Sequence, residues 1–100
     1  MRILLVEDEA ELATWLSKAL AQSDFSVEWT NKGAMAENLL ASEEFDAMVL
    51  DLGLPDKSGS EVLAAMRARD ERLPVLILTA RDSVDQRVAT LRAGADDVLA

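Results

Sequence analysis

Residues 47–51 read Ala-Met-Val-Leu-Asp, an apolar run that ends on a carboxylate, and this stretch decides the fold. Similar apolar runs occupy residues 3–6, 75–78 and 98–100. Runs that are apolar without alternation are typical of parallel strands covered on both faces. Residues 26–30 alternate instead, which predicts a strand at the edge of the sheet with one wetter face.

Between these runs the apolar residues recur at spacings of three and four, the period of a helix with one buried stripe. The stripes are Leu12, Trp15, Leu16, Ala19 and Leu20; Ala36, Leu39 and Leu40; Val62, Leu63 and Met66; and Val84, Val88 and Leu91. We expect these side chains to be core. Strands that alternate with helices predict an α/β domain over residues 1–100, with helices on both faces of a parallel sheet. The edge strand favours the flavodoxin-like, doubly wound five-stranded order 2-1-3-4-5 over half of a Rossmann domain.

The composition narrows the chemistry that the chain can carry. Ten Lys and Arg against nineteen Asp and Glu give a net charge of −9, which repels phosphate backbones and anionic lipid. The chain has no Cys and no His, so it lacks thiolate ligands, a thiol nucleophile and the usual general base near neutral pH. The apolar runs are too short for a signal peptide or a membrane span. We therefore expect a cytoplasmic protein that does not itself bind DNA or a membrane.

Polar side chains follow three neighbouring strands of the predicted sheet. Glu7 and Asp8 follow the first strand, Asp51 the third and Thr79 the fourth. The carboxyl ends of parallel strands meet at one edge, where α/β sheets bind ligands. Carboxylates without nitrogen or sulfur ligands suit Mg²⁺, which leaves room for phosphoryl oxygens. The sequence thus predicts a phosphoryl-transfer site in which Asp51 can accept the phosphoryl group and Thr79 can donate a hydrogen bond.

Each of these polar residues, taken alone, could have a simpler structural role. Glu9 and Glu11 are better explained as solvated residues at the start of a helix, where the dipole favours acids. Asp51 alone could form a turn, and Thr79 alone could cap a helix. The joint position of Asp51 and Thr79 with the acids of the first strand favours a site.

These segments resemble the receiver domains of two-component response regulators over essentially the whole chain. The motifs that carry the resemblance are ILLVEDE (3–9), FDAMVLDLGLPDKSG (45–59), LPVLILTAR (73–81) and RAGADDVLA (92–100). The last two are most similar to the branch whose effector is a winged-helix DNA-binding domain. Many members of that branch have an aromatic residue where this chain has Val98, and in the family a Lys and a last helix, lacking here, follow the segment that matches 98–100.

The resemblance implies a set of roles. Asp51 accepts a phosphoryl group from the phosphohistidine of a sensor histidine kinase, or from small phosphodonors, and loses it slowly. Glu7, Asp8 and Asp51 hold Mg²⁺ together with the backbone carbonyl of Gly53, and Thr79 is the switch hydroxyl. The output is control of transcription through an attached DNA-binding domain, and the chain could form a homodimer.

The sequence leaves one other function open and argues against a second. A phosphorylation-independent interaction or dimerisation module would keep the same fold. A phosphatase of the haloacid dehalogenase type needs a second Asp two residues after its nucleophile, where this chain has Gly53. In addition, a sheet without the last helix would leave apolar surface open beside the first helix. We therefore expect the 100-residue chain made alone to self-associate or to be partly molten.

Overall fold

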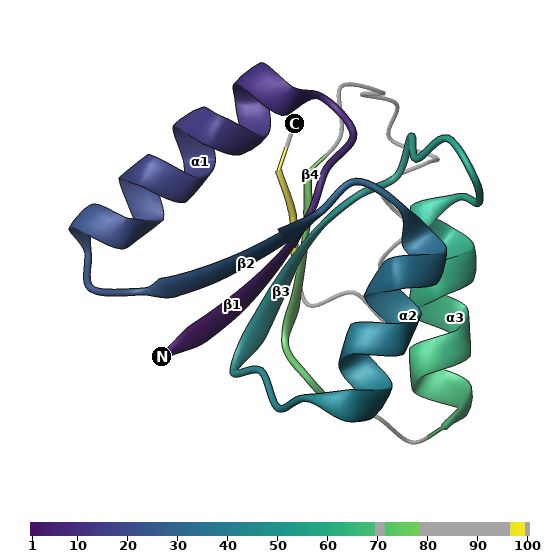
Figure 1. Ribbon diagram of the computed structural model, residues 1–100. Coiled ribbons are helices and arrows are strands. Elements are labelled where there is room, and N and C mark those ends of the chain that lie inside the picture. The colour runs from purple at the N-terminus through teal and green to yellow at the C-terminus, as the bar shows by residue number, and fades with distance from the viewer. Residues whose placement is uncertain (70–71, 79–96, 100) are drawn as a thin grey trace.

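The computed structural model describes residues 1–69, 72–78 and 97–99 (Figure 1). In chain order the elements are β1 (Arg2–Val6), α1 (Ala10–Gln22), β2 (Ser26–Thr30), α2 (Gly33–Ser42), β3 (Ala47–Asp51), α3 (Gly59–Ala68), β4 (Val75–Leu78) and β5 (Asp97–Leu99). The strands form one parallel sheet in the order β2-β1-β3-β4-β5. The predicted fold class and strand order are confirmed. The helix expected through Val84, Val88 and Leu91 lies outside the described residues.

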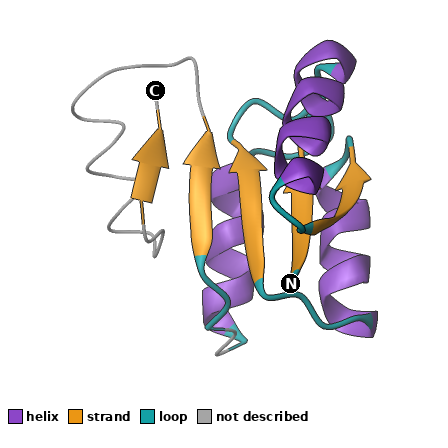
Figure 2. Cartoon of the chain, turned by 90° about the vertical axis from the view of Figure 1, so that its left-hand side faces the viewer, coloured by secondary structure: helices purple, strands orange, loops and turns teal. Residues whose placement is uncertain are grey.

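The helices cover the two faces of the sheet unequally. Figure 2 shows α1 on one face, and α2 and α3 on the other. The main core lies between the sheet and the pair α2 and α3, and it consists of Leu4, Val6, Ala36, Met48, Leu50, Leu52, Leu54, Val62, Leu63, Met66, Leu73, Val75 and Ile77. Within the described residues, each helix is too short or too polar to cross a bilayer.

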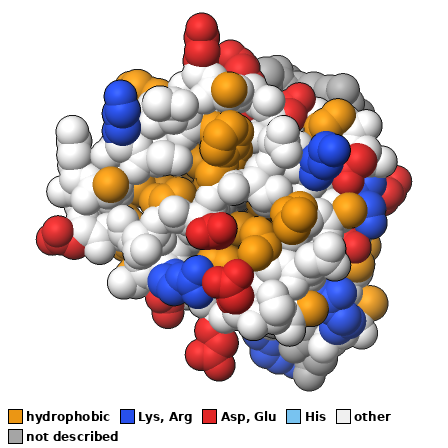
Figure 3. All heavy atoms as spheres, in the orientation of Figure 1, with side chains coloured by type: hydrophobic (Ala, Val, Ile, Leu, Met, Phe, Trp, Pro, Cys, Tyr) orange, Lys and Arg blue, Asp and Glu red, His pale blue; other side chains and the backbone are white. Residues whose placement is uncertain are grey.

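The α1 face of the sheet is less completely covered. Along β3 and β4 the residues alternate between buried ones and half-buried ones, and Val49 and Leu76 are among the half-buried. In α1 only Ala13 is fully buried, and Trp15 is 65% exposed. The prediction that Trp15 belongs to the core is therefore wrong. Among the described helices α1 alone covers this face, so within the described residues no second helix packs beside α1 (Figure 2). Figure 3 shows other hydrophobic side chains at the surface.

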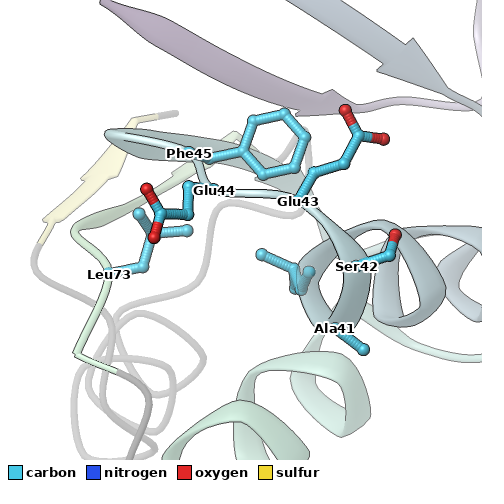
Figure 4. Close-up of a pocket in the computed structure, with 7 residues that line it drawn as sticks. Ala41, Ser42, Glu43, Glu44, Phe45 and Leu73 are labelled. Carbon is cyan, nitrogen blue, oxygen red and sulfur yellow. The ribbon is translucent and has the colours of Figure 1, made fainter.

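Polar contacts hold the edge of the sheet at which the strands begin. The Arg2 guanidinium contacts the Glu43 carboxylate at 2.8 Å and lies 4.7 Å from the centre of the Phe45 ring. The Arg2 backbone N–H donates to the Asp46 carboxylate at 2.6 Å. Beside these residues, Phe45 and Leu73 line a shallow hollow with the end of α2 (Figure 4). Because its lining residues precede β3 and β4, the hollow lies at the opposite edge from the predicted site.

Candidate functional site

Three carboxylates meet beyond the carboxyl ends of β1 and β3. These strands are neighbours, and Val6 pairs with Leu50 in the register. The residues that follow therefore emerge side by side, and Glu7, Asp8 and Asp51 each offer a carboxylate oxygen within 4.8 Å of the others. The structure thus brings together the three side chains that the sequence predicted as metal ligands. Thr79 lies outside the described residues.

Glu7 is the buried member of the cluster, with 3% of its surface exposed. Its carboxylate Oε1 accepts a hydrogen bond from the Glu9 backbone N–H at 3.0 Å, and its own backbone N–H donates to the Thr30 carbonyl at 3.1 Å. Burial raises the pKa of the Glu7 carboxyl to about 7, and the charges of Asp51 and Asp8 act in the same direction. The hydrogen bond from Glu9 opposes them. Ionisation of the Glu7 carboxyl without a positive charge nearby therefore costs free energy.

Asp51 is held by the backbone around it. Burial raises the pKa of the Asp51 carboxyl, and Asp8 adds to the effect, while hydrogen bonds from the Gly53 and Leu52 backbone act against it. The start of α3 packs directly on the end of β3, where the Gly59 backbone N–H donates to the Leu52 carbonyl at 3.1 Å. A Cβ at Gly59 would lie 2.9 Å from Leu52 Cα, so the close approach requires glycine here. This packing fixes the backbone that carries the Asp51 carboxylate.

The loop after Asp51 is tied to the start of α2. The Asp56 carboxylate accepts hydrogen bonds from the backbone N–H groups of Gly33 at 2.8 Å and Ala34 at 2.9 Å, which lower its pKa. Next to it the Lys57 ammonium pairs with Glu37 at 3.0 Å. No local sequence pattern predicts this cap, because its partners lie 22 and 23 residues apart.

The donor set fits a hard divalent cation. The three side chains offer only oxygen, and in the described part of the chain neither ion pair, Arg2 to Glu43 or Lys57 to Glu37, involves them. Oxygen-only donors with a net negative charge are what Mg²⁺ prefers, and its charge would offset both the burial and the repulsion from Asp51 and Asp8 that raise the pKa of Glu7. Glu9 and Glu11 lie exposed at the start of α1, as predicted.

Comparison with known proteins identifies the family. The response regulator receiver domain family matches residues 3–100. The chain belongs to this family. The receiver is 50% identical over 99 residues to the transcriptional regulatory protein TctD of Salmonella typhimurium and 48% identical over 99 residues to the response regulator protein PmrA of Pseudomonas aeruginosa. Each alignment covers 99% of the receiver but only 44% and 45% of the relatives. The chain thus spans less than half the length of these relatives.

Solved receiver structures have the same fold. The BeF3-activated N-terminal receiver domain of Klebsiella pneumoniae RstA superposes with a TM-score of 0.93 at 31% identity, over 99% of this receiver and 84% of that chain. The response regulator protein TrrA of Thermotoga maritima, in complex with Mg²⁺ and BeF, superposes with a TM-score of 0.87 at 27% identity, over 98% and 84%. One of these receivers thus binds Mg²⁺, the kind of cation that the acidic cluster of this chain fits.

Proposed function

We propose that this receiver accepts a phosphoryl group on Asp51 from the phosphohistidine of a sensor histidine kinase, with Mg²⁺ as its cofactor. The observation that carries the proposal is the convergence of the Glu7, Asp8 and Asp51 carboxylates within 4.8 Å at the carboxyl edge of the sheet. The Mg²⁺ and BeF complex of the related TrrA supports it, since both chains have the receiver fold.

In the transfer, an Asp51 carboxylate oxygen forms a bond to phosphorus while the bond from phosphorus to the histidine nitrogen breaks, and the imidazole leaves with that electron pair. Glu7, Asp8 and Asp51, with the backbone carbonyl of Gly53, would hold the metal. Bound Mg²⁺ supplies positive charge beside the phosphoryl oxygens. The backbone groups that hydrogen-bond to Asp51 keep its carboxylate oriented for attack. Slow attack of water on the acyl phosphate then returns free Asp51 and phosphate.

Thr79 and the segment after it would carry the output. The Thr79 hydroxyl follows β4, the strand next to β3, and would donate a hydrogen bond to a phosphoryl oxygen on Asp51. That contact would shift the population of the segment from Val84 to Leu91. In a longer cytoplasmic regulator, an attached winged-helix DNA-binding domain would convert the shift into transcription control. The names of TctD and other relatives support this output.

Phosphorylation by acetyl phosphate tests the function directly. Acetyl phosphate with Mg²⁺ should add one phosphoryl group, detected by intact mass spectrometry, and Asp51→Asn should remove it. Asp8→Ala should weaken both Mg²⁺ binding and labelling. Glu11→Ala is the matched acidic control, because Glu11 lies exposed in the first turn of α1, and it should change neither. Thr79→Ala should keep the label but lose the change in amide exchange over residues 84–91.

The same experiment can reject the proposal. Labelling that persists in Asp51→Asn would show that another residue accepts the phosphoryl group. A folded parent chain that binds no Mg²⁺ and takes no label would instead support a phosphorylation-independent interaction module. The open apolar groove beside α1, lined by Ile3, Leu20, Phe25 and Leu76 among others, gives such a module a surface through which to form a homodimer.

A further inference from the structure

The Trp29 side chain reaches from the edge strand to the acidic cluster. Trp29 lies in β2, pairs with Leu5 in the register, and is 42% exposed. Its indole Nε1–H donates a hydrogen bond to the backbone carbonyl oxygen of Glu7 at 2.8 Å, across 22 residues of sequence. The bond is short and joins a large, stiff side chain to the first residue after β1.

This bond controls the peptide that links Glu7 to Asp8. A peptide unit is planar, so holding the Glu7 carbonyl also sets the direction of the Asp8 backbone N–H. On the other side, the Glu7 backbone N–H is held by the Thr30 carbonyl at 3.1 Å. Glu7 is thus fixed through both of its peptide groups by consecutive residues of β2, Trp29 and Thr30.

The position of the Asp8 carboxylate depends on that peptide more than the positions of the Glu7 and Asp51 carboxylates do. Glu7 is buried and Asp51 ends a strand of the sheet, but Asp8 is exposed and follows β1 in the loop before α1. Little packing holds the exposed Asp8 side chain, so the position of its carboxylate depends on its hydrogen bonds to the Glu7 and Asp51 carboxyls and on the direction of its backbone. Without the indole donor, the Glu7–Asp8 peptide could rotate and move the Asp8 carboxylate out of the cluster.

We propose that Trp29 is a positioning residue of the metal site, which holds the Glu7–Asp8 peptide so that the carboxylates of both residues face a divalent cation together with Asp51. The inference rests on the proposed Mg²⁺ site and adds a residue that is itself no ligand. It predicts that β2, through Trp29, contributes to cation affinity.

Replacement of each tryptophan in turn gives a matched pair. Trp29→Phe removes the indole donor but keeps an aromatic ring, and Trp15→Phe makes the same change on α1, where Trp15 is 65% exposed. By isothermal titration calorimetry, Trp29→Phe should weaken Mg²⁺ binding about tenfold, the lower end of the loss seen when residues behind metal ligands are replaced. Trp15→Phe should leave the affinity unchanged. Equal Mg²⁺ affinity in Trp29→Phe and the parent would overturn the inference.

Nuclear magnetic resonance of the parent chain supplies a second readout that needs no variant. The Trp29 indole ¹H–¹⁵N resonance should shift as Mg²⁺ is added and saturate with the calorimetric dissociation constant, while the Trp15 resonance stays in place. A Trp29 resonance that does not move while Mg²⁺ binds would overturn the inference and leave the proposed function standing. A folded parent chain that binds no Mg²⁺ would contradict both.

Discussion

The two edges of the sheet hold their acidic residues in opposite ways. Where the strands begin, Glu43 and Asp46 are both bound by Arg2. Where β1 and β3 end, Glu7 and Asp51 lie with Asp8, and the pKa values of Glu7 and Asp51 are raised. Acids paired within the fold contribute to its stability, whereas gathered acids with raised pKa values cost stability and are typical of functional sites. One edge of the sheet therefore pairs its acids within the fold, whereas the other gathers acids at the candidate site.

The largest expected effect is a pH dependence that originates from Glu7. The pKa of its carboxyl is about 7 in the fold against an ordinary value of 4.5, so the folded state binds the proton more tightly than the unfolded state does. In Mg²⁺-free buffer, the contribution of Glu7 to stability is therefore fully present below pH 4.5 and is lost as pH rises through 7. The loss is on the order of 3 kcal/mol in the free energy of unfolding.

Glu7→Gln isolates this contribution, because the amide oxygen still accepts the hydrogen bond from Glu9 while the charge is gone. In urea titrations without Mg²⁺, the variant should be more stable than the parent at pH 8, and the difference should vanish near pH 4. If the unfolding free energies of parent and variant changed with pH in the same way, the Glu7 charge would not destabilise the fold. The acids at the carboxyl edge would then cost no more stability than those at the opposite edge.

A slightly smaller effect is expected from Mg²⁺ itself. A ligand that binds only the folded state at one hundred times its dissociation constant stabilises a protein by about 2.7 kcal/mol. At pH 8 the parent chain should gain stability of that size from Mg²⁺ in urea unfolding. Asp8→Ala should lose most of the gain, and Glu43→Gln, an acid of the opposite edge, should keep all of it. A full gain in Asp8→Ala would mean that Mg²⁺ binds elsewhere.

The sequence predicts the carboxyl edge of the sheet well, because local patterns determine it. The apolar runs of β1 and β3 end directly before Glu7 and at Asp51, and parallel pairing then brings their carboxylates together whatever the details of the packing. The alternation of residues 26–30 likewise predicts that β2 is an outermost strand of the sheet.

Side-chain contacts between elements are what the sequence leaves undetermined. Trp15 has helical periodicity typical of a core residue, yet it is exposed, because periodicity identifies a stripe and not how far the neighbouring layer extends. The hydrogen bond of Trp29 to Glu7 and the cap that Asp56 gives α2 both join residues more than twenty positions apart. Such contacts depend on the relative placement of whole elements, which no local pattern contains. The assignment of Thr79 stays a prediction.

The smallest expected effect tests the paired edge. Arg2→Met keeps a flexible apolar stem but removes the ion pair to Glu43 and the contact of the guanidinium with the Phe45 ring. Because the Arg2 and Glu43 side chains are 40% and 38% exposed, solvent screens the pair, and the variant should lose only about 0.5–1 kcal/mol of unfolding free energy. High salt should shrink the difference between parent and variant, since screening weakens an exposed ion pair in the parent alone. A loss of several kcal/mol that salt leaves unchanged would mean that Arg2 acts through packing, so the two edges would then differ in more than their charge pairing.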